Sequence, residues 1–176
     1  VFAGSATVFG LPRTTPVDES HPFAPVTAYC LHKLFAQQTL ELYGRLGWGQ
    51  GCTLLLANVY GPGPATQGAD RGILNKMIRK AMRGEDLTLY GKGEQLRDYV
   101  HVEDVADAFV AAATHPDQAR GRYFIVASGQ GTSLADAFAL VAQSVQRKLG
   151  LATQVKSVPV PADSPAPSVP MTRMKP

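Results

Sequence analysis

The sequence predicts an α/β fold built on a parallel sheet. Segments typical of strands alternate with segments typical of helices along most of the 176 residues, and this alternation is typical of helices that connect parallel strands. Apolar residues make up 45% of the chain and charged residues 18%, which is an ordinary globular composition. A chain of this length can bury a hydrophobic core, so we expect a folded protein rather than a disordered one.

The N-terminal part is expected to hold a strand and a long helix. Residues 1–4 form a short apolar run that ends in small residues, and a loop with four prolines follows it. Thr27 can cap a helix that runs to about Gly44, because threonine is a favoured N-cap residue. Five residues follow the helical spacing in this segment: Leu31, Leu34, Phe35, Gln38 and Leu42.

The rest of the chain continues the alternation. In order, we expect a buried strand at 52–59 closed by the turn YGPGP, an amphipathic helix at 72–84, short strands at 87–91 and 96–102, a helix at 103–115 and a strand at 122–128. Ser133 then begins a long helix, with Asp136 at the capping-box position. From Val158 onward, five prolines in VPVPADSPAPSVP predict a loop or linker.

Charge and cysteine content exclude several classes of protein. The net charge of +3 is mild and no block of lysine and arginine occurs, so we expect no nucleic-acid binding. No apolar run is long enough to span a membrane, and no metal site is predicted. Cys30 and Cys52 are the only cysteines, and we interpret them as free thiols in a reducing compartment. We therefore expect a soluble, cytoplasmic protein.

The glycine-rich turn that binds dinucleotides is absent from the sequence. That turn has the pattern G-x-G-x-x-G between a strand and a helix, and every glycine pair at the right offset here lacks the third glycine. Either the protein binds no dinucleotide, or the half that carries the turn is missing from this chain. Because the chain begins within a strand and without an initiator methionine, we expect it to be a fragment of a longer protein.

Tyr29 and Lys33 lie four residues apart in the predicted helix and so share one face of it. The charge of Lys33 favours the phenolate form of Tyr29, which could then act as a general base. Ser5 ends the first predicted strand, where α/β sheets bind ligands, and could donate a hydrogen bond to the same substrate oxygen. The spacing alone is common on helices, however, and by itself is more typical of a solvated surface pair.

Four segments change that interpretation when they are taken together. SATVFG, YCLHK, ANVYGPG and LTLYGKGEQLRDYVHVEDVADAF occur in this order, and RDYVHVEDVA is the most specific of them. Over residues 1 to about 150, the chain resembles the extended short-chain dehydrogenase/reductases, specifically the NAD-dependent epimerase/dehydratase family that acts on nucleotide sugars.

The resemblance implies a Rossmann-type doubly wound parallel sheet with a smaller α/β substrate-binding domain. Residues 1–60 would be the C-terminal part of the NAD-binding domain and would carry the catalytic set. Residues 61–176 would be mainly the nucleotide-sugar domain, with some segments returning to the Rossmann sheet. A homodimer is implied for the full-length protein.

The same resemblance implies a catalytic set of Ser5, Tyr29 and Lys33. Tyr29 would take the proton from a sugar hydroxyl, and Ser5 would hydrogen-bond the same oxygen. Lys33 would hold the cofactor ribose and favour the phenolate of Tyr29. The implied cofactor is NAD, with NADP left open, and Ala57 would line the nicotinamide pocket beside the three catalytic residues.

Five further residues are implied to bind the nucleotide sugar. Asn58 would contact the diphosphate, Arg97 would clamp it, and Tyr99 would line the same pocket. Thr88 and Tyr90 would lie against the nucleotide base. The residues alone leave plainer alternatives open, which are a turn-forming asparagine, an edge strand at LTLYG and a structural ion pair of the arginine with one of two nearby aspartates.

One departure from the family pattern bears on the reaction. Nucleotide-sugar dehydratases usually carry an Asp-Glu or a Ser-Glu pair after the catalytic hydroxyl, to protonate the leaving water, whereas this chain has Ala6 and Thr7 there. We therefore expect an NAD-dependent nucleotide-sugar 4-epimerase. A dehydratase or keto-sugar reductase of the same family is the alternative, and a non-catalytic sensor of NAD(P) or another ligand is the alternative of a different class. This chain alone is expected not to bind NAD tightly or to turn over.

Overall fold

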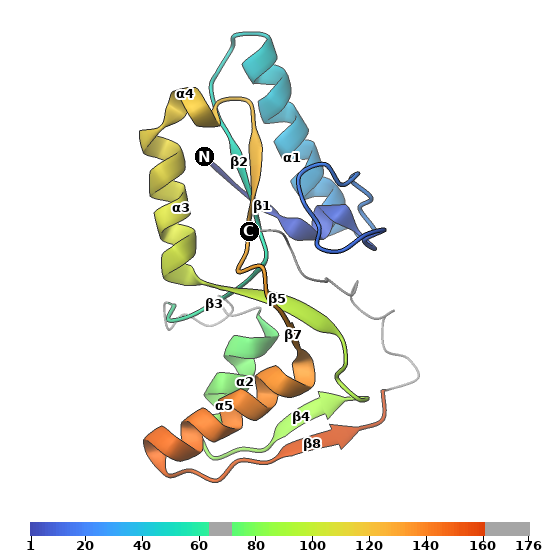
Figure 1. Cartoon of the computed structure of the whole chain (residues 1–176), viewed down its shortest axis with the longest axis vertical. Coiled ribbons are helices and arrows are strands. Elements are labelled where there is room, and N and C mark those ends of the chain that lie inside the picture. The colour runs from blue at the N-terminus through green and yellow to red at the C-terminus, as the bar shows by residue number, and fades with distance from the viewer. Residues whose placement is uncertain (64–71, 161–176) are drawn as a thin grey trace.

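The computed structural model describes residues 1–63 and 72–160 and confirms the predicted α/β fold. Its strands form a parallel sheet in the order β1-β2-β6, a second sheet in the order β3-β5-β7, and a two-stranded sheet of β4 and β8. Figure 1 shows the first sheet at one end of an elongated molecule and the β4-β8 sheet at the other, with β3, β5 and β7 between them.

The first sheet contains β1 (Phe2–Ser5), β2 (Thr53–Leu56) and β6 (Tyr123–Val126), all parallel. Helices α1 (Ala28–Arg45) and α3 (Val102–Thr114) flank it on opposite sides (Figure 1). A short 3-10 helix, η1 (Ala6–Phe9), follows β1, and a short helix, α4 (Pro116–Ala119), follows α3. We define the sheet cluster as the buried apolar residues that hold this region together: Ala6, Val8, Phe9, Val17, Leu34, Leu55 and Ile125.

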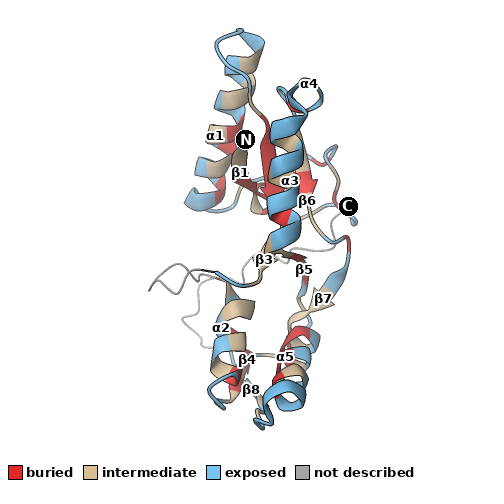
Figure 2. Ribbon diagram, turned by 90° about the vertical axis from the view of Figure 1, so that its left-hand side faces the viewer, coloured by how far each residue is buried: buried red, intermediate tan, exposed pale blue. Residues whose placement is uncertain are grey.

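The opposite end is formed by two helices packed on a two-stranded sheet. Helices α2 (Ile73–Ala81) and α5 (Leu134–Leu149) lie beside β4 (Leu87–Tyr90), which pairs in parallel with β8 (Val155–Val158). We define the helix cluster as the buried residues of this region: Met77, Ala81, Leu87, Leu89, Ala137, Phe138, Val141 and Val145. Figure 2 shows the buried segments of the two regions as separate groups along the molecule.

The connecting sheet is centred on β5 (Leu96–His101). This strand pairs in parallel with β3 (Asn58–Tyr60) and antiparallel with β7 (Gly131–Ser133). Because β5 follows β4 and is followed by α3, it carries the chain from the helix cluster back to the first sheet.

Local capping explains where the two longest helices begin. Thr27 accepts a hydrogen bond from the backbone N–H of Cys30 at 3.2 Å, and Ser133 accepts one from that of Asp136 at 3.0 Å. Each bond satisfies an N–H group that has no partner within its helix. Both predicted helix starts are therefore confirmed.

The two ends of the loop between η1 and α1 cross each other at close range, where Gly10 meets Ala24. Gly10 has a φ of 64°, and a Cβ at this position would lie 1.9 Å from the carbonyl oxygen of Ala24. Next to this crossing, the N–H of Ala24 donates to the carbonyl oxygen of Val8 at 2.9 Å. Glycine is required here because any other side chain would clash with the backbone.

Several sequence-based predictions need correction. The predicted strand at 52–59 is divided at Ala57 into β2 and β3, because its two halves pair with different strands. Strand β8 ends at Val158, where a loop was predicted to begin, and β7, η1 and α4 were not predicted. The remainder of the predicted proline-rich loop, residues 161–176, and the end of the YGPGP turn lie outside the described residues.

The apolar spacing predicted for α1 does not mark one buried face. Leu34 is 7% exposed, whereas Leu31, Phe35 and Leu42 are 39%, 56% and 43% exposed. Both cysteines are free thiols, as predicted, and both are buried. None of the helices in the described ranges has the length and apolar character needed to span a bilayer.

Candidate functional site

Ser5 lies at the carboxyl end of β1 and is 8% exposed. It is the N-cap of η1, and its hydroxyl oxygen accepts a hydrogen bond from the N–H of Thr7 at 3.4 Å. The hydroxyls of Ser5 and Thr7 are also hydrogen-bonded, at 2.8 Å. The side chain that was predicted to contact a substrate oxygen is thus held in place at the end of a strand, where parallel α/β sheets bind ligands.

Tyr29 and Lys33 come from the first turns of α1, which packs beside β1. The Lys33 ammonium donates to the carbonyl oxygen of Ala3 at 2.8 Å, and it lies 5.9 Å from the centroid of the Tyr29 ring. Its distance to the ring of Phe2 is 5.0 Å. The Tyr29 side chain is 55% exposed, so its hydroxyl is open to a ligand while the ammonium beside it is anchored.

The carbonyl that Lys33 binds belongs to the edge of the sheet. The N–H of Phe2 donates to the carbonyl oxygen of Cys52, toward β2. Because backbone groups alternate in direction along a strand, those of Ala3 point to the opposite edge, where no strand pairs with β1 among the described residues. Lys33 therefore places a positive charge beside β1, next to Tyr29.

Ala57 and Asn58, which were predicted to contact cofactor and substrate, lie where β2 gives way to β3. The N–H of Ala57 donates to the carbonyl oxygen of Val126 at 3.0 Å, which continues the first sheet past the end of β2. The side-chain amide of Asn58 donates to the carbonyl oxygen of Asp98 at 3.0 Å. One role of Asn58 is therefore to join β3 to β5.

Thr88 and Tyr90 lie on β4, in a different sheet from Ser5. They alternate with the buried Leu87 and Leu89, so they occupy the face of the strand that points away from the helix cluster. The Tyr90 side chain is 54% exposed. Tyr90 is thus open to solvent, as a contact with a flat aromatic base requires, and Thr88 is half-buried.

Arg97 and Tyr99 lie on the same face of β5, two residues apart. Arg97 is 7% exposed and donates from Nη1 to the carbonyl oxygen of Leu96 at 2.9 Å. Burial lowers the pKa of the Arg97 guanidinium and raises the pKa of the Tyr99 phenol. The buried Tyr99 hydroxyl has no hydrogen-bond partner among the described residues, which is a costly arrangement that a bound oxygen-rich ligand would relieve.

Asp98 has a structural role that the sequence did not reveal. The side chain is fully buried, and its carboxylate accepts hydrogen bonds from the N–H and hydroxyl of Ser128, each at 2.8 Å, and from the N–H of Gly129 at 3.0 Å. These bonds fix the segment after β6 to β5. An aspartate inside a predicted strand was at most a weak signal, because β5 also contains Arg97 and His101 and a carboxylate needs hydrogen-bond partners only where it is buried.

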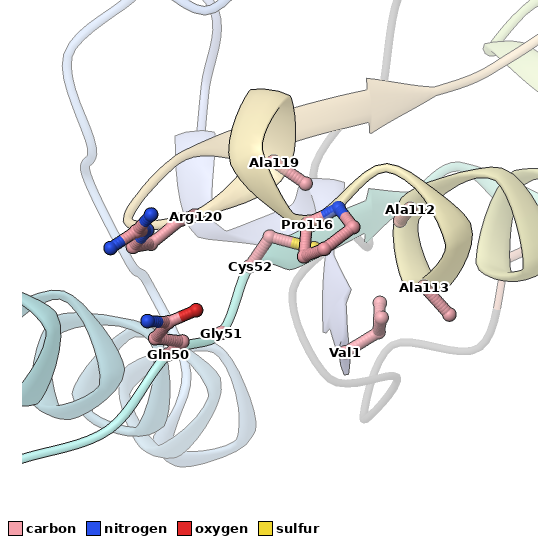
Figure 3. A pocket seen from close by; sticks show the side chains of 9 residues that line it. All are labelled: Val1, Gln50, Gly51, Cys52, Ala112, Ala113, Pro116, Ala119 and Arg120. Carbon is pink, nitrogen blue, oxygen red and sulfur yellow. The ribbon is translucent and has the colours of Figure 1, made fainter.

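One described pocket lies away from all the predicted site residues. It has a volume of about 190 Å³ and is lined by Val1, Gln50, Gly51, Cys52, Ala112, Ala113, Pro116, Ala119 and Arg120 (Figure 3). These residues surround the amino ends of β1 and β2, whereas Ser5 lies at the carboxyl end of β1. The pocket is therefore distinct from the candidate site.

Comparison with known sequences identifies a family. The model of the NAD dependent epimerase/dehydratase family matches residues 1–127. A UDP-glucose 4-epimerase of Mycolicibacterium smegmatis is 31% identical over 81% of this chain and 45% of its own length. A dTDP-L-rhamnose 4-epimerase of Burkholderia thailandensis is 33% identical over 71% of this chain and 34% of its own length. The chain thus spans less than half the length of both relatives.

Solved structures agree with this result. The UDP-glucose 4-epimerase of Thermus thermophilus, in complex with NAD, is 26% identical, with a TM-score of 0.80 over 99% of this chain and 54% of that protein. The enzyme of Brucella ovis, also in complex with NAD, is 26% identical, with a TM-score of 0.75 over 99% of this chain and 55% of that protein. The fold and the predicted resemblance are both confirmed, and the chain belongs to the NAD dependent epimerase/dehydratase family.

Proposed function

We propose that the protein containing this chain is an NAD-dependent nucleotide-sugar 4-epimerase with Tyr29 as its base. The observation that carries the proposal is the ammonium of Lys33, bound to the Ala3 carbonyl and lying beside the exposed Tyr29 ring. Ser5 ends the strand to which Lys33 is bound, so the three side chains arise from one corner of the first sheet. Relatives named as UDP-glucose and dTDP-L-rhamnose 4-epimerases support the substrate class.

In this proposal the chain's own residues handle the proton of a sugar hydroxyl. Tyr29 takes the proton as the phenolate, is the neutral phenol until it returns the proton, and has the ammonium of Lys33 beside its ring. The Ser5 hydroxyl donates a hydrogen bond to the same sugar oxygen. NAD, when bound, would supply the acceptor and donor for the hydrogen of the neighbouring sugar carbon.

The residues present fit the nicotinamide and ribose end of NAD. Lys33 holds an ammonium beside β1, from which it could hydrogen-bond ribose hydroxyls beside Tyr29. Ala57 lies at the carboxyl end of the neighbouring strand. No G-x-G-x-x-G turn occurs in the sequence, so we assign no residue of this chain to the diphosphate of the cofactor.

We propose that the nucleotide sugar is bound by residues of β3, β4 and β5. The buried guanidinium of Arg97 and the Tyr99 hydroxyl, which has no hydrogen-bond partner within residues 1–63 and 72–160, suit the oxygens of a diphosphate. The exposed face of β4, with Thr88 and Tyr90, suits a nucleotide base. Asn58 would complete the set where β2 passes into β3. The two hydrophobic clusters support the division into a cofactor part at residues 1–60 and a mainly substrate part at 61–176, with α3 and β6 returning to the first sheet.

We further propose that the whole protein is a homodimer that uses α1. Leu31, Phe35 and Leu42 project from this helix and are exposed, at positions where a second helix could cover them. A cytoplasmic location is also proposed, and the two free cysteines support it.

The test of the proposed function is Tyr29→Phe in the whole protein. This change removes only the phenolic hydroxyl, and because Tyr29 is 55% exposed we expect an unchanged fold. We expect kcat for 4-epimerisation of a UDP- or dTDP-hexose to fall about 10²–10⁴-fold, with NAD binding retained. Tyr43→Phe is the matched control, because Tyr43 lies on the same helix and is 44% exposed.

Two outcomes contradict the proposal. If the unaltered protein converts none of these nucleotide sugars, the assigned reaction is wrong. If Tyr29→Phe is as active as Tyr43→Phe, the reaction stands but Tyr29 is not its base.

A further inference from the structure

The residues proposed to bind the phosphates of the nucleotide sugar share one face of the connecting sheet. Asn58 of β3 lies opposite Tyr99 of β5 in the sheet register, and Arg97 lies two residues before Tyr99. Residues opposite each other on neighbouring strands point to the same face, as do residues two apart on one strand. We call the face defined by these three residues the ligand face.

The pairing of β5 with β7 brings Thr132 to the ligand face. Thr132 lies directly opposite Arg97 in the antiparallel register. The Cβ atoms of such a pair are about 4.5–5.5 Å apart, so both side chains can reach one phosphate group. Thr132 is half-buried, and its hydroxyl hydrogen can turn toward any nearby acceptor. An oxygen of a phosphate bound by Arg97 would be such an acceptor.

Gln95 extends the ligand face toward β4. The carbonyl oxygen of Gln95 accepts from the N–H of Leu134 at 3.2 Å, so the pairing of β5 with the segment after β7 continues to this residue. Gln95 lies two residues before Arg97 and therefore on the same face. The chain turns from β4 into β5 through residues 91–94, so Gln95 lies between Arg97 and β4 along the chain.

The side chain of Gln95 contains a buried atom that lacks a hydrogen bond. Its oxygen Oε1 is shielded from solvent and has no hydrogen-bond partner in the part of the chain that the structure describes. The same is true of the Tyr99 hydroxyl, four residues further along the ligand face. Leaving a buried polar atom unpaired is costly. Two such atoms, one on each side of the Arg97 guanidinium along the strand, therefore point to a polar ligand.

The one carboxylate of β5 points away from the ligand face. Asp98 alternates with Arg97 and Tyr99 along the strand, and its carboxylate accepts from the N–H groups of Ser128 and Gly129. The five side chains placed on the ligand face are two amides, a phenol, a hydroxyl and one guanidinium. This set suits an anion that has hydroxyl groups beside it.

We propose that Thr132 and Gln95 bind the nucleotide: Thr132 donates to the diphosphate beside Arg97, and Gln95 binds a hydroxyl of the ribose. The inference rests on the proposed function, in which β4 meets the base and Arg97 the diphosphate. The ribose lies between these two groups in a nucleotide, as Gln95 lies between Tyr90 and Arg97 in the chain. A hydroxyl can both donate and accept, so it satisfies the Gln95 amide whichever way the amide is turned.

The first test measures the binding of UDP and dTDP to the whole protein, loaded with NAD, by calorimetry, and continues with the tighter of the two. Gln95→Leu keeps roughly the size of the side chain and removes its polar atoms. We expect the Kd to rise about fivefold to tenfold, because one hydrogen bond to the ligand is lost. Without nucleotide, the thermal midpoint should stay the same or rise, because the unpaired atom is gone. An analogue of the nucleotide that lacks the ribose hydroxyls should bind the variant and the unaltered protein equally.

Leu96→Ala is the matched control, because Leu96 is 40% exposed and alternates with Gln95 and Arg97, so it points to the opposite face. If Gln95→Leu binds the nucleotide as tightly as Leu96→Ala does, the assignment of Gln95 is wrong. It is also wrong if Gln95→Leu weakens the binding of the analogue as much as that of the nucleotide.

The second test compares Thr132→Val with Thr132→Ser. Valine keeps the shape of threonine but removes the hydroxyl, whereas serine keeps the hydroxyl. For Thr132→Val we expect the Kd of the nucleoside diphosphate to rise about fivefold, and for Thr132→Ser we expect no change. The Kd of the nucleoside without phosphates should be the same in both variants. An equal loss of diphosphate affinity in both variants, or no loss in Thr132→Val, would overturn the assignment of Thr132.

Both tests measure binding and need no catalysis, so they separate this inference from the proposed function. A protein that shows these effects on binding but epimerises no nucleotide sugar would refute the proposed function alone. An active epimerase whose variants bind the nucleotide normally would refute this inference alone. If the unaltered protein binds neither UDP nor dTDP, both are wrong.

Discussion

The two ends of the molecule are held together by different kinds of contact. At the first sheet, polar side chains bind the backbone of the edge strands: Lys33 donates to the Ala3 carbonyl of β1, and the Glu19 carboxylate accepts from the Ile125 N–H of β6. At the other end, the helices and the two-stranded sheet are held together by apolar packing. Phe138 of α5 is 2% exposed, and Leu87 of β4 is completely buried.

Because of this difference, the proposed catalytic residues are not the residues that contribute most to the stability of the fold. Tyr29 and Lys33 lie beside β1 and are not members of the sheet cluster, so changing them should alter a reaction more than the fold. The helix cluster contains none of the proposed catalytic residues, and its stability comes from burying apolar surface, at about 25 cal/mol for each Å².

The largest expected effect is in the helix cluster. Phe138→Ala removes a buried ring between α5 and β4, and we expect the free energy of unfolding to fall by about 3–5 kcal/mol. Urea denaturation followed by circular dichroism measures this loss. Leu140→Ala is the matched control, because Leu140 is on the same helix and 58% exposed. A similar loss in both variants would show that the helix cluster does not carry the stability of this end.

A smaller effect is expected at the edge of the first sheet. Glu19→Ala removes the acceptor for the N–H of Ile125, which is 2.9 Å from the carboxylate, and should cost about 1–2 kcal/mol. Hydrogen exchange of the Ile125 amide should also become faster. Glu19→Gln retains a side-chain oxygen and should cost less. If the glutamine variant loses as much as the alanine variant, the effect of Glu19 does not come from this bond.

The smallest effect is expected at the pair that joins β4 to β8. The Lys156 ammonium binds the Asp86 carboxylate, and the hydrogen bond from Lys156 is the main cause that lowers the pKa of Asp86. A carboxyl whose pKa is lower in the folded state stabilises the fold above its unfolded pKa of about 4, and this contribution is lost as the pH falls through the folded value. The Asp86 side chain is 39% exposed and that of Lys156 is 60% exposed, so solvent screens the pair and the contribution is small.

Asp86→Asn tests this pH dependence. The variant should be slightly less stable than the unaltered protein at neutral pH, and the difference should disappear in acid, as measured by urea midpoints across the pH range. A difference that stays constant with pH would mean that the carboxylate charge is not involved.

Local signals in the sequence were sufficient for the helix starts. Thr27 and Ser133 each bind a backbone N–H only three residues away, so the sequence alone contains both partners. The order of Ser5, Tyr29 and Lys33 also indicated their common position, since a helix that follows a strand packs back onto the sheet. Their catalytic roles remain proposals.

Features that depend on distant partners could not be predicted. The division of 52–59 follows from the pairing of β2 with β1 and β6, and of β3 with β5. The exposure of Phe35 beside the buried Leu34 depends on which side of α1 meets the sheet. Glu19 binds a residue 106 positions away, and Asp98 binds one 30 positions away, so neither role has a local pattern.

The two ends of the loop between η1 and α1 meet at Gly10, so a change at the tip of this loop does not have to move the candidate site. Because Ala24 binds Val8 at the base of this loop, the turn that holds Ser5 and the start of α1 are tied together there rather than through the loop tip. Thr14 and Thr15 lie in the exposed outer part, where inserted residues are best tolerated. Insertions are therefore tolerated at this tip only, because Val17 belongs to the sheet cluster and Glu19 binds the N–H of Ile125, and position 10 requires glycine. An engineer could place a tag or a reporter peptide at the tip without moving the candidate catalytic side chains.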